Sequence, residues 1–505
     1  MAELVREMYS SIVPQPAQIL QVPVKGDSIV PDTKPDADKI LQTSVRYLPE
    51  DAVQDRKRIR MQGKLEFTVL YLSQEEVPRL QSLTALLPVE EEVNLDGIIQ
   101  EDDRIRFQMA YSPENIHSTL LNGRKVSLSA LLEIEVRITK YQDTSVVMDV
   151  SGEDNLVLQT VKQKMQRLIG DKEEKLVVRE SAAIRESGPN IQEILWWDAS
   201  ILDRSCRLLE GRVQLKGTLH MSVLYQSESG VEFMERKTDF AGLIDVDGAQ
   251  ESMQVSAQLE LVKGSVTMQA DNDGEMRLID MEVIVSGHVR VWDEEERELV
   301  IDAYDTQREV QLEKTKRPMQ QMLYHDRVRV DVSDTLAIPE GMPMALQVFC
   351  TTARPKLDDV FLEDQALHIE GVLYVTAFCL TADDRSPVIS FMQPVPFSKL
   401  IDMPQAADNP NIEISCYLEQ IKAELRGESE LSFSALVILD ISVTAQQEQA
   451  VLTNLTMGEE QTDELPQMAL CFLQPGETLW DVGKRYRVRP ESMEAMGDRM
   501  LIVVK

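Results

Sequence analysis

The chain has 505 residues, which is more than one hydrophobic core usually organises, so three or four domains are expected. Its 52 Lys and Arg residues against 86 Asp and Glu residues give a formal net charge of −34, which argues against binding to nucleic acid or anionic lipid. The 43% of hydrophobic residues is typical of a globular protein, and no apolar run approaches the roughly 20 residues that cross a bilayer.

The start of the chain and its cysteines indicate a cellular compartment. Residues 1–16 lack the long apolar run behind a basic start that marks a secretory signal. Five cysteines are few and odd in number, and none has a spacing suited to zinc: Cys206, Cys350, Cys379, Cys416 and Cys471. We therefore expect a soluble protein of a reducing cytoplasm, with no metal ion and no cofactor.

One segment of alternating apolar residues occurs three times, each time beginning at a glycine: 63–71, 217–225 and 371–379. The glycines are 154 residues apart in both steps. A second motif, a proline followed by apolar residues two, five and six positions later, has the same spacing: Pro35, Pro189 and Pro343. Two motifs in one register predict three tandem domains, at 1–145, 150–295 and 305–446.

Each copy is predicted to be mainly β and sandwich-like. In the first copy, Leu65, Phe67 and Val69 alternate with polar residues, the pattern of a strand with one buried face. Such strands, separated by turn residues, predict either two packed sheets or one twisted open sheet per copy. Residues 155–170 stay open between strand and helix, because their apolar residues recur at spacings of three and four. Pro318 argues against a long helix at the matching place in the third copy.

Trp196 and Trp197 form the most conspicuous aromatic pair of the chain. Alternation along a strand would turn one ring inward and the other outward. The inward ring would pack in a core, whereas the outward ring could contact a partner, since aromatic residues are enriched at protein interfaces. Both interpretations stay open.

The end of the chain has a different pattern. Residues 447–469 are acidic with few aromatics and are predicted to form a linker. A small domain over 470–505 is then predicted in the order βααβ, with a Pro-Gly turn after the first strand and a helix capped by Thr478. Pro490 suits the first position of a second helix that runs to about Met496, and residues 500–504 form the last strand.

The sequence Pro-Gly-Glu-Thr-Leu-Trp-Asp at 475–481, with a closing Gly-x-x-x-Leu-Ile, resembles the LysM family. The resemblance implies a shallow groove for N-acetylglucosamine-containing glycans. The candidate binding residues are Pro475, Gly476, Glu477, Thr478, Leu479, Trp480, Tyr486 and Gly497. Trp480 lies one position off the apolar stripe of its helix, so packing and binding both stay open for it. The family's asparagine and loop after the second helix are missing, which shortens the groove and favours a protein ligand over a glycan.

Three β-rich copies with a proline motif ahead of the Gly-x-Leu strand resemble the SPOCS domains of spore-forming Firmicutes. Three such domains followed by a LysM-like module resemble the SipL family of clostridial spore-coat morphogenetic proteins. The resemblance implies a scaffold in the mother-cell cytoplasm, at the forespore surface and coat. It also implies binding to the coat-basement ATPase SpoIVA, or a similar coat protein, through the last domain.

No motif of a metallohydrolase, P-loop enzyme, serine hydrolase or dinucleotide-binding enzyme occurs in the chain. The histidines inside strand patterns, His220, His288 and His368, are interpreted as structural. Two classes of function stay open: a non-enzymatic scaffold of spore-coat assembly, and a protein that binds peptidoglycan of the cortex or wall. The absence of an export signal and the short groove favour the scaffold.

Overall fold

The computed structural model describes residues 3–184, 189–383, 385–403, 410–427, 429–460, 468–495 and 500–504. Almost all of these residues lie in antiparallel β-strands, and the single α-helix of this part of the chain is α1 (Leu479–Tyr486). The prediction of a mainly β protein is confirmed. Among the helices of the described residues, none is long and apolar enough to cross a membrane.

The strands fall into three consecutive groups, called copies 1, 2 and 3 here. Copy 1 comprises β1 (Glu3–Pro14), β2 (Gln18–Ile29), β3 (Ala37–Asp55), β4 (Arg58–Ser73), β5 (Leu80–Asn94), β6 (Ile105–Asn122) and β7 (Lys125–Ser151). Copy 2 comprises β8 (Leu156–Ala183), β9 (Ile191–Leu209), β10 (Arg212–Ser227), β11 (Gly230–Asp245), β12 (Gln254–Ala270) and β13 (Met276–Asp305). Copy 3 comprises β14 (Arg308–Ala337), β15 (Ala345–Glu363), β16 (Ala366–Thr381), β17 (Val388–Asp402), β18 (Asn411–Arg426) and β19 (Glu430–Glu460).

Each copy contains two antiparallel sheets with the same connections. One sheet has the order β3-β4-β5 in copy 1, β9-β10-β11 in copy 2 and β15-β16-β17 in copy 3. The other sheet has the order β8-β13-β12 in copy 2 and β14-β19-β18 in copy 3. In copy 1, β1 and β2 both pair with β7 and together take the place of the single strands β8 and β14. Of the two predicted arrangements, the structure therefore has two sheets per copy.

The core of each copy lies between its two sheets. Leu65, Phe67 and Val69 of β4 are fully buried, as their alternation predicts. They belong to one apolar cluster with Leu128 and Leu132 of β7, which face them from the other sheet. Period-two alternation therefore places one face of each strand in the core.

The repeated glycine of the sequence motif is a packing requirement. A Cβ atom at Gly217 would lie 2.8 Å from Cζ of Phe240, on the neighbouring strand. A Cβ atom at Gly371 would lie 2.6 Å from Cζ of Phe397 in the same arrangement. An aromatic ring of the next strand thus occupies the space that any larger residue would need.

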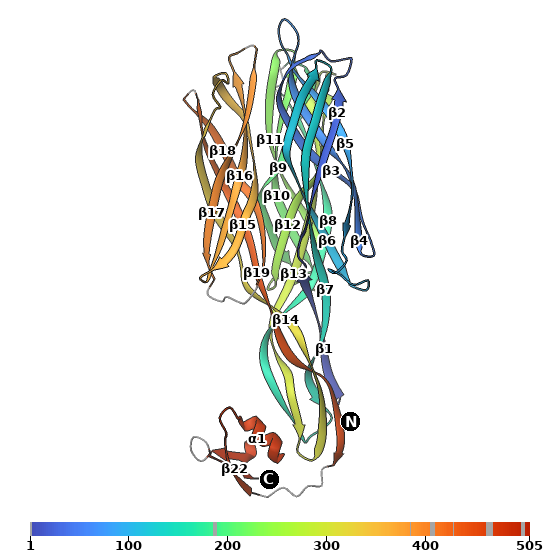
Figure 1. The fold of residues 1–505 in the computed structure, drawn as a ribbon, viewed down its shortest axis with the longest axis vertical. Coiled ribbons are helices and arrows are strands. Elements are labelled where there is room, and N and C mark those ends of the chain that lie inside the picture. Colours follow the sequence, from blue (N-terminus) through green and yellow to red (C-terminus); the bar gives the residue numbers. More distant parts are fainter. Residues whose placement is uncertain are drawn as a thin grey trace.

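The three copies stand around a common axis (Figure 1). Residues spaced by 154 positions come together on this axis, as Leu70, Leu224 and Phe378 do. The axial cluster, as we name it, consists of the buried residues Leu70, Leu80, Leu195, Trp196, Leu224, Phe349, Cys350, Phe378 and Val388. Because matching residues converge, the single chain has approximate threefold symmetry.

The two rings of the tryptophan pair pack in different clusters, and both contact copy 1 of the same chain. Trp197 packs against the core of copy 2, and the Arg46 guanidinium of copy 1 lies 3.7 Å from its ring centre. Trp196 is 5% exposed and lies in the axial cluster instead, 4.6 Å from the ring of Phe378 of copy 3. Its Nε1 donates to Oγ of Ser44 of copy 1 at 3.2 Å. Trp196 therefore lies in an interface between copies of the same chain.

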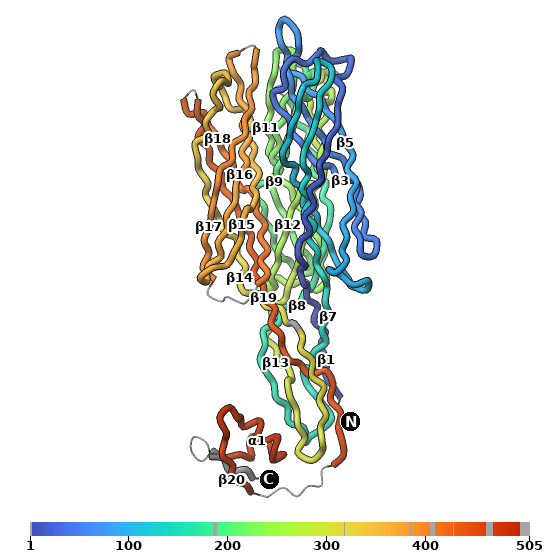
Figure 2. The backbone as a smooth tube through the Cα atoms, in the orientation of Figure 1, coloured from blue at the N-terminus to red at the C-terminus, as the bar shows by residue number. Residues whose placement is uncertain are grey.

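The long strands of each copy continue beyond the body as hairpins (Figures 1 and 2). We call the paired segments the stalk: 3–14 with 139–151, 156–168 with 292–305, and 308–322 with 444–460. An equivalent residue is skipped in the register of each hairpin: Met148, Ile301 and Thr453. The hairpin of copy 3 has a further register shift between Arg308 and Val310. Equivalent apolar residues are buried together here as well: Val147, Val300 and Leu452. The stalk thus continues the approximate threefold symmetry of the body.

The stalk corrects several sequence predictions. The predicted domain ends at 145, 295 and 446 fall inside β7, β13 and β19, because these strands run on into the stalk. The predicted acidic linker is wrong over residues 447–460, which belong to β19 and pair with β14. Its residues 461–467 lie outside the described part of the chain, and Met468 begins the next strand. The open segment 155–170 is strand β8 from Leu156 onward.

The C-terminal module, residues 468–504, contains β20 (Met468–Phe472), α1, a 3₁₀ turn (Pro490–Ser492), β21 (Met493–Ala495) and β22 (Met500–Val504). Its sheet has the order β20-β22-β21. The predicted first strand, first helix and last strand are present, but the predicted second α-helix is wrong. After one 3₁₀ turn the chain enters β21, because the residues from Met493 on pair with the backbone of β22.

Candidate functional site

The turn before α1 is built as its sequence indicates. Gly476 has a left-handed φ of 87°, which explains a glycine at this position. Thr478 caps the helix: its side chain accepts from the Asp481 backbone N–H, and the Asp481 carboxylate accepts from the Thr478 backbone N–H at 2.8 Å. The predicted cap at Thr478 is confirmed, and with Asp481 it forms a capping box, so the loop that would begin a LysM groove has a fixed conformation.

One face of α1 lies against the stalk hairpin of copy 2. Trp480 Nε1 donates to Oδ2 of Asp302 at 2.9 Å, and Lys484 Nζ lies 2.9 Å from Oδ1 of the same residue. The Trp480 ring meets Tyr304 edge-on, with ring centres 4.8 Å apart. Tyr304 in turn donates its hydroxyl proton to the carbonyl of Val488 at 2.7 Å. The C-terminal module is therefore fixed to the end of β13 by a small, mostly polar contact.

The charge of Asp302 is stabilised by this contact. Burial alone would raise the pKa of Asp302, but hydrogen bonds from Trp480, Lys484 and Lys314 outweigh it, so the pKa is lowered. Burial raises the pKa of Tyr304 to about 12. Near neutral pH, Asp302 is therefore an ionised acceptor and Tyr304 a neutral donor.

A second face of the module carries apolar side chains into solvent. Met468, Leu470 and Phe472 alternate along β20 and are 67%, 57% and 66% exposed. We call these three residues the β20 stripe. The residue between the last two, Cys471, is buried in the module's own core. Within the described residues, β20 pairs only with β22, so it is an edge strand with an exposed apolar face.

The predicted binding residues are distributed over different parts of the module. Trp480 faces the stalk, whereas Leu479 is 49% exposed. Tyr486 packs against the module's core, and Glu477 forms an ion pair with Arg485. Pro475 and Gly476 are exposed in the turn, Thr478 is the helix cap, and Gly497 lies outside the described residues.

Sequence reasoning missed Asp302 and Tyr304, the residues that hold the module. Both lie near the end of a long strand of copy 2, far from the C-terminal motif in sequence. No local pattern marks them, because an acid and a tyrosine at the end of a strand are ordinary surface residues. Their role depends on a tertiary contact.

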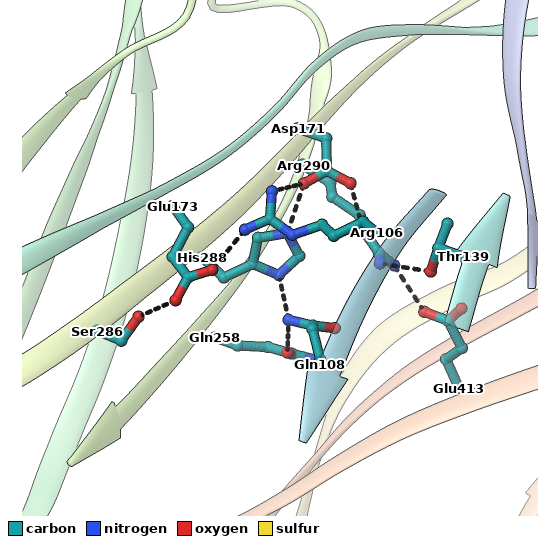
Figure 3. Close-up of polar contacts among 10 residues, drawn as sticks. All are labelled: Arg106, Gln108, Thr139, Asp171, Glu173, Gln258, Ser286, His288, Arg290 and Glu413. Atoms are coloured by element: carbon teal, nitrogen blue, oxygen red, sulfur yellow. Dashed lines mark hydrogen bonds and ion pairs between the residues drawn. The ribbon is translucent and has the colours of Figure 1, made fainter. Parts of the chain in front are cut away.

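A second polar site lies between the copies, around Asp171 of β8 (Figure 3). Its carboxylate lies 2.7 Å from Arg106 NH1 of copy 1, 2.6 Å from His288 Nε2 and 3.2 Å from Arg290 Nε. Gln108 of copy 1 donates to Nδ1 of His288 at 2.9 Å, which leaves the ring proton on Nε2, facing Asp171. Copies 1 and 2 are thus joined by hydrogen-bonded charges.

Arg290 extends this network to copy 3 (Figure 3). Its NH1 lies 3.2 Å from Oε2 of Glu413, and its NH2 donates to Oγ1 of Thr139 of copy 1 at 3.2 Å. The side chains of Asp171 and Arg290 are 2% and 8% exposed. We call Asp171, His288, Arg290, Arg106 and Glu413 the inter-copy network.

The electrostatics of this network follow from its burial. Burial alone would raise the pKa of Asp171, but the hydrogen bond from His288 and the charges of Arg290 and Arg106 outweigh it and hold the pKa at about 2. Burial also lowers the pKa of His288 by more than Asp171 raises it. At neutral pH an ionised Asp171 and a neutral His288 therefore lie between two guanidinium groups.

The chemistry of this arrangement is that of a cross-link. Both oxygens of Asp171 and both ring nitrogens of His288 already have protein partners. In the described part of the chain, no group of three or more His, Cys, Asp or Glu side chains could hold a metal ion. The network therefore joins the three copies.

Comparison with known families gives one match. The family model described as SipL, SPOCS domain matches residues 190–269 and 345–426. These segments hold β9 to β12 of copy 2 and β15 to β18 of copy 3, so the matched unit recurs at the same place in both copies. No curated protein and no solved structure matches the chain. The chain is similar to the SipL family in two of its copies, which indicates a sporulation-related protein.

Proposed function

We propose that this protein is a non-enzymatic scaffold of spore-envelope assembly, located in the mother-cell cytoplasm at the forespore surface. In this proposal the C-terminal module is LysM-like and binds a coat-basement protein similar to SpoIVA. The three copies form a rigid body that holds the module at one end. The SPOCS match in copies 2 and 3 supports the sporulation role, and the LysM-like sequence of 475–481 supports the choice of module.

The observation that carries the proposal is the β20 stripe. Three large apolar side chains that are more than half exposed on one short strand are unusual for a module that has its own buried core. Burying them against a partner would be favourable by about 25 cal/mol per Å² of apolar area. Trp480 already contacts the stalk, so we assign the partner to the stripe, which is a continuous row of exposed apolar side chains on the module.

The proposal is tested with the full chain and a purified SpoIVA-like coat protein. The double variant Leu470→Ser, Phe472→Ser is expected to weaken binding at least tenfold, because both apolar contacts are lost. Leu400→Ser, at a 55% exposed leucine of the body, is the matched control and should bind as the unmodified chain does. Equal binding by the unmodified chain, the double variant and the control would contradict a binding site on the β20 stripe. Retention of the unmodified chain on insoluble peptidoglycan, without binding to the coat protein, would favour the glycan-binding alternative.

A further inference from the structure

Two small cavities lie on the axis where the body meets the stalk. Each has a volume of about 10 Å³. Both are lined by all three copies, and both include Gln166 of copy 2 and Gln320 of copy 3. The first is completed on the side of copy 1 by residues such as Ser11 and Thr144, and the second by Ile12.

These two glutamines occupy equivalent positions of the repeat. Gln166 and Gln320 are 154 residues apart, and the matching residue of copy 1 is Ile12. Ile12 is 3% exposed and Gln166 is 6% exposed. A position that copy 1 fills with an apolar residue is therefore polar in the other two copies, in the middle of a largely apolar axis.

The buried amide of Gln166 has no hydrogen-bond partner among the described residues. Neither Nε2 nor Oε1 of Gln166 forms a hydrogen bond within the described part of the chain. Nε1 of Trp292, which lines the second cavity, also forms none there. Burying such groups without a partner carries the full desolvation penalty of each group. Since proteins almost always satisfy buried polar atoms, a small hydrogen-bonding species is required here.

We propose that each cavity binds one ordered water molecule, and that the two waters connect Gln166 to the other copies. A volume of about 10 Å³ is close to the minimum of roughly 10–15 Å³ that holds a water. The water of the second cavity accepts from Trp292 Nε1 and bonds the Gln166 amide. The water of the first cavity bonds the same amide and the hydroxyl groups of Ser11 and Thr144.

The lining favours water over a cation. Glu413 is the one carboxylate that lines either cavity, and it is paired with Arg290 at 3.2 Å. The other polar lining groups are neutral amides, hydroxyls and an indole N–H. An uncharged molecule that both donates and accepts suits this set, whereas a cation would find no free negative charge.

The first test is oxygen-17 relaxation dispersion of water on the full chain, which counts water molecules held for longer than the protein's tumbling time. Gln166→Met keeps the side-chain size and removes both polar atoms, so the dispersion amplitude should fall by the contribution of two waters. Gln163→Met, on the same strand but lining neither cavity, should leave the amplitude unchanged. An unchanged amplitude in Gln166→Met would overturn the proposal.

A crystal structure of the unmodified chain is the second test and does not depend on how any variant folds. It should show one density peak in each cavity, about 2.7–3.2 Å from the Gln166 amide. Empty cavities would contradict the proposal. A peak with several oxygen ligands at about 2.3–2.4 Å would do the same, since such distances indicate a bound cation.

Discussion

The contacts that join the three copies and the contact that joins the C-terminal module to the stalk differ in their relation to the repeat. Much of the axial cluster lies at positions that recur every 154 residues, and Leu70, Leu224 and Phe378 are an equivalent set that is apolar in each copy and buried together. The C-terminal module instead contacts Asp302 and Tyr304 of copy 2, and its Arg489 donates to the carbonyl of Asp154, just before β8. The copies therefore meet through equivalent residues of the repeat, whereas the module is held by residues near one end of copy 2. This difference predicts that the body unfolds as one unit and that the module can detach without unfolding it.

The largest effect is expected from the axial cluster. Phe378→Ala removes a fully buried ring that contacts Trp196 and Phe349, so the free energy of unfolding should fall by roughly 3–5 kcal/mol. Met392→Ala, at a 64% exposed position of the same copy, should change it by less than about 0.5 kcal/mol. Denaturant unfolding measures both. A single transition is expected, and separate transitions for the copies would contradict the idea of one body.

Removal of the charge at the centre of the inter-copy network is expected to have the next largest effect. Asp171→Asn keeps the shape of the side chain but leaves Arg106 and Arg290 without their shared carboxylate. Breaking such a buried pair costs about 3 kcal/mol or more. Chemical denaturation at pH 7 tests this, and Asp245→Asn is the control, because its carboxylate is 81% exposed. Equal stability of the two variants would mean that the network contributes little.

The stability of the body should also depend on pH through this network. The pKa of His288 is lowered in the folded state, so the unfolded chain binds a proton first as the pH falls below the ordinary value of about 6.5. That proton favours unfolding, and stability should decrease from about pH 6.5 downward. Asp171 adds a second loss of about 2 kcal/mol as the pH falls from about 4 to about 2, from its lowered pKa.

His288→Gln isolates the first part of this pH dependence, because glutamine does not titrate. Unfolding midpoints at pH 7 and pH 5.5 should differ less for this variant than for the unmodified chain. If the difference is the same in both proteins, another group is responsible.

The smallest effect on global stability is expected at the module's junction. Asp302→Ala removes the acceptor of Trp480 and Lys484, so hydrogen exchange of the α1 amides should become faster, with less than about 1 kcal/mol change in the unfolding of the body. Asp149→Ala is a matched control. Asp149 and Asp302 each accept a hydrogen bond from the next residue's backbone N–H, beside the residue that is skipped in the register of their hairpins. If Asp149→Ala also made the exchange of the α1 amides faster, the cause would be a general change in the stalk hairpins and not the lost contact with Trp480 and Lys484.

Local patterns predicted the repeat and the strands, since alternation and turn residues are properties of neighbouring positions. Leu65 and Phe67 are buried where the alternation placed them. The stalk could not be predicted in the same way. Residues 447–449 of β19 are polar because only part of a stalk hairpin faces the axis, and the same composition is typical of a linker.

The candidate site was predictable only in part. The cap at Thr478 is local and was predicted, whereas the second helix was wrong because β22 pairs with Met493–Ala495. The exposure of the β20 stripe was missed, since a short apolar strand usually indicates a core. The inter-copy network depends on residues more than 100 positions apart, such as Asp171, His288 and Glu413, which no spacing connects.

The strand β19 gives the molecule a mechanical property. It runs from the top of the body through the stalk toward the C-terminal module and pairs with β14 over its length (Figure 1). If a partner pulls on the module while the upper end is held, the force acts along β19. The hydrogen bonds to β14 and β18 are perpendicular to that direction, so they are sheared together and not opened one after another. The chain is therefore suited to transmit tension between an anchored surface and the structure built on it.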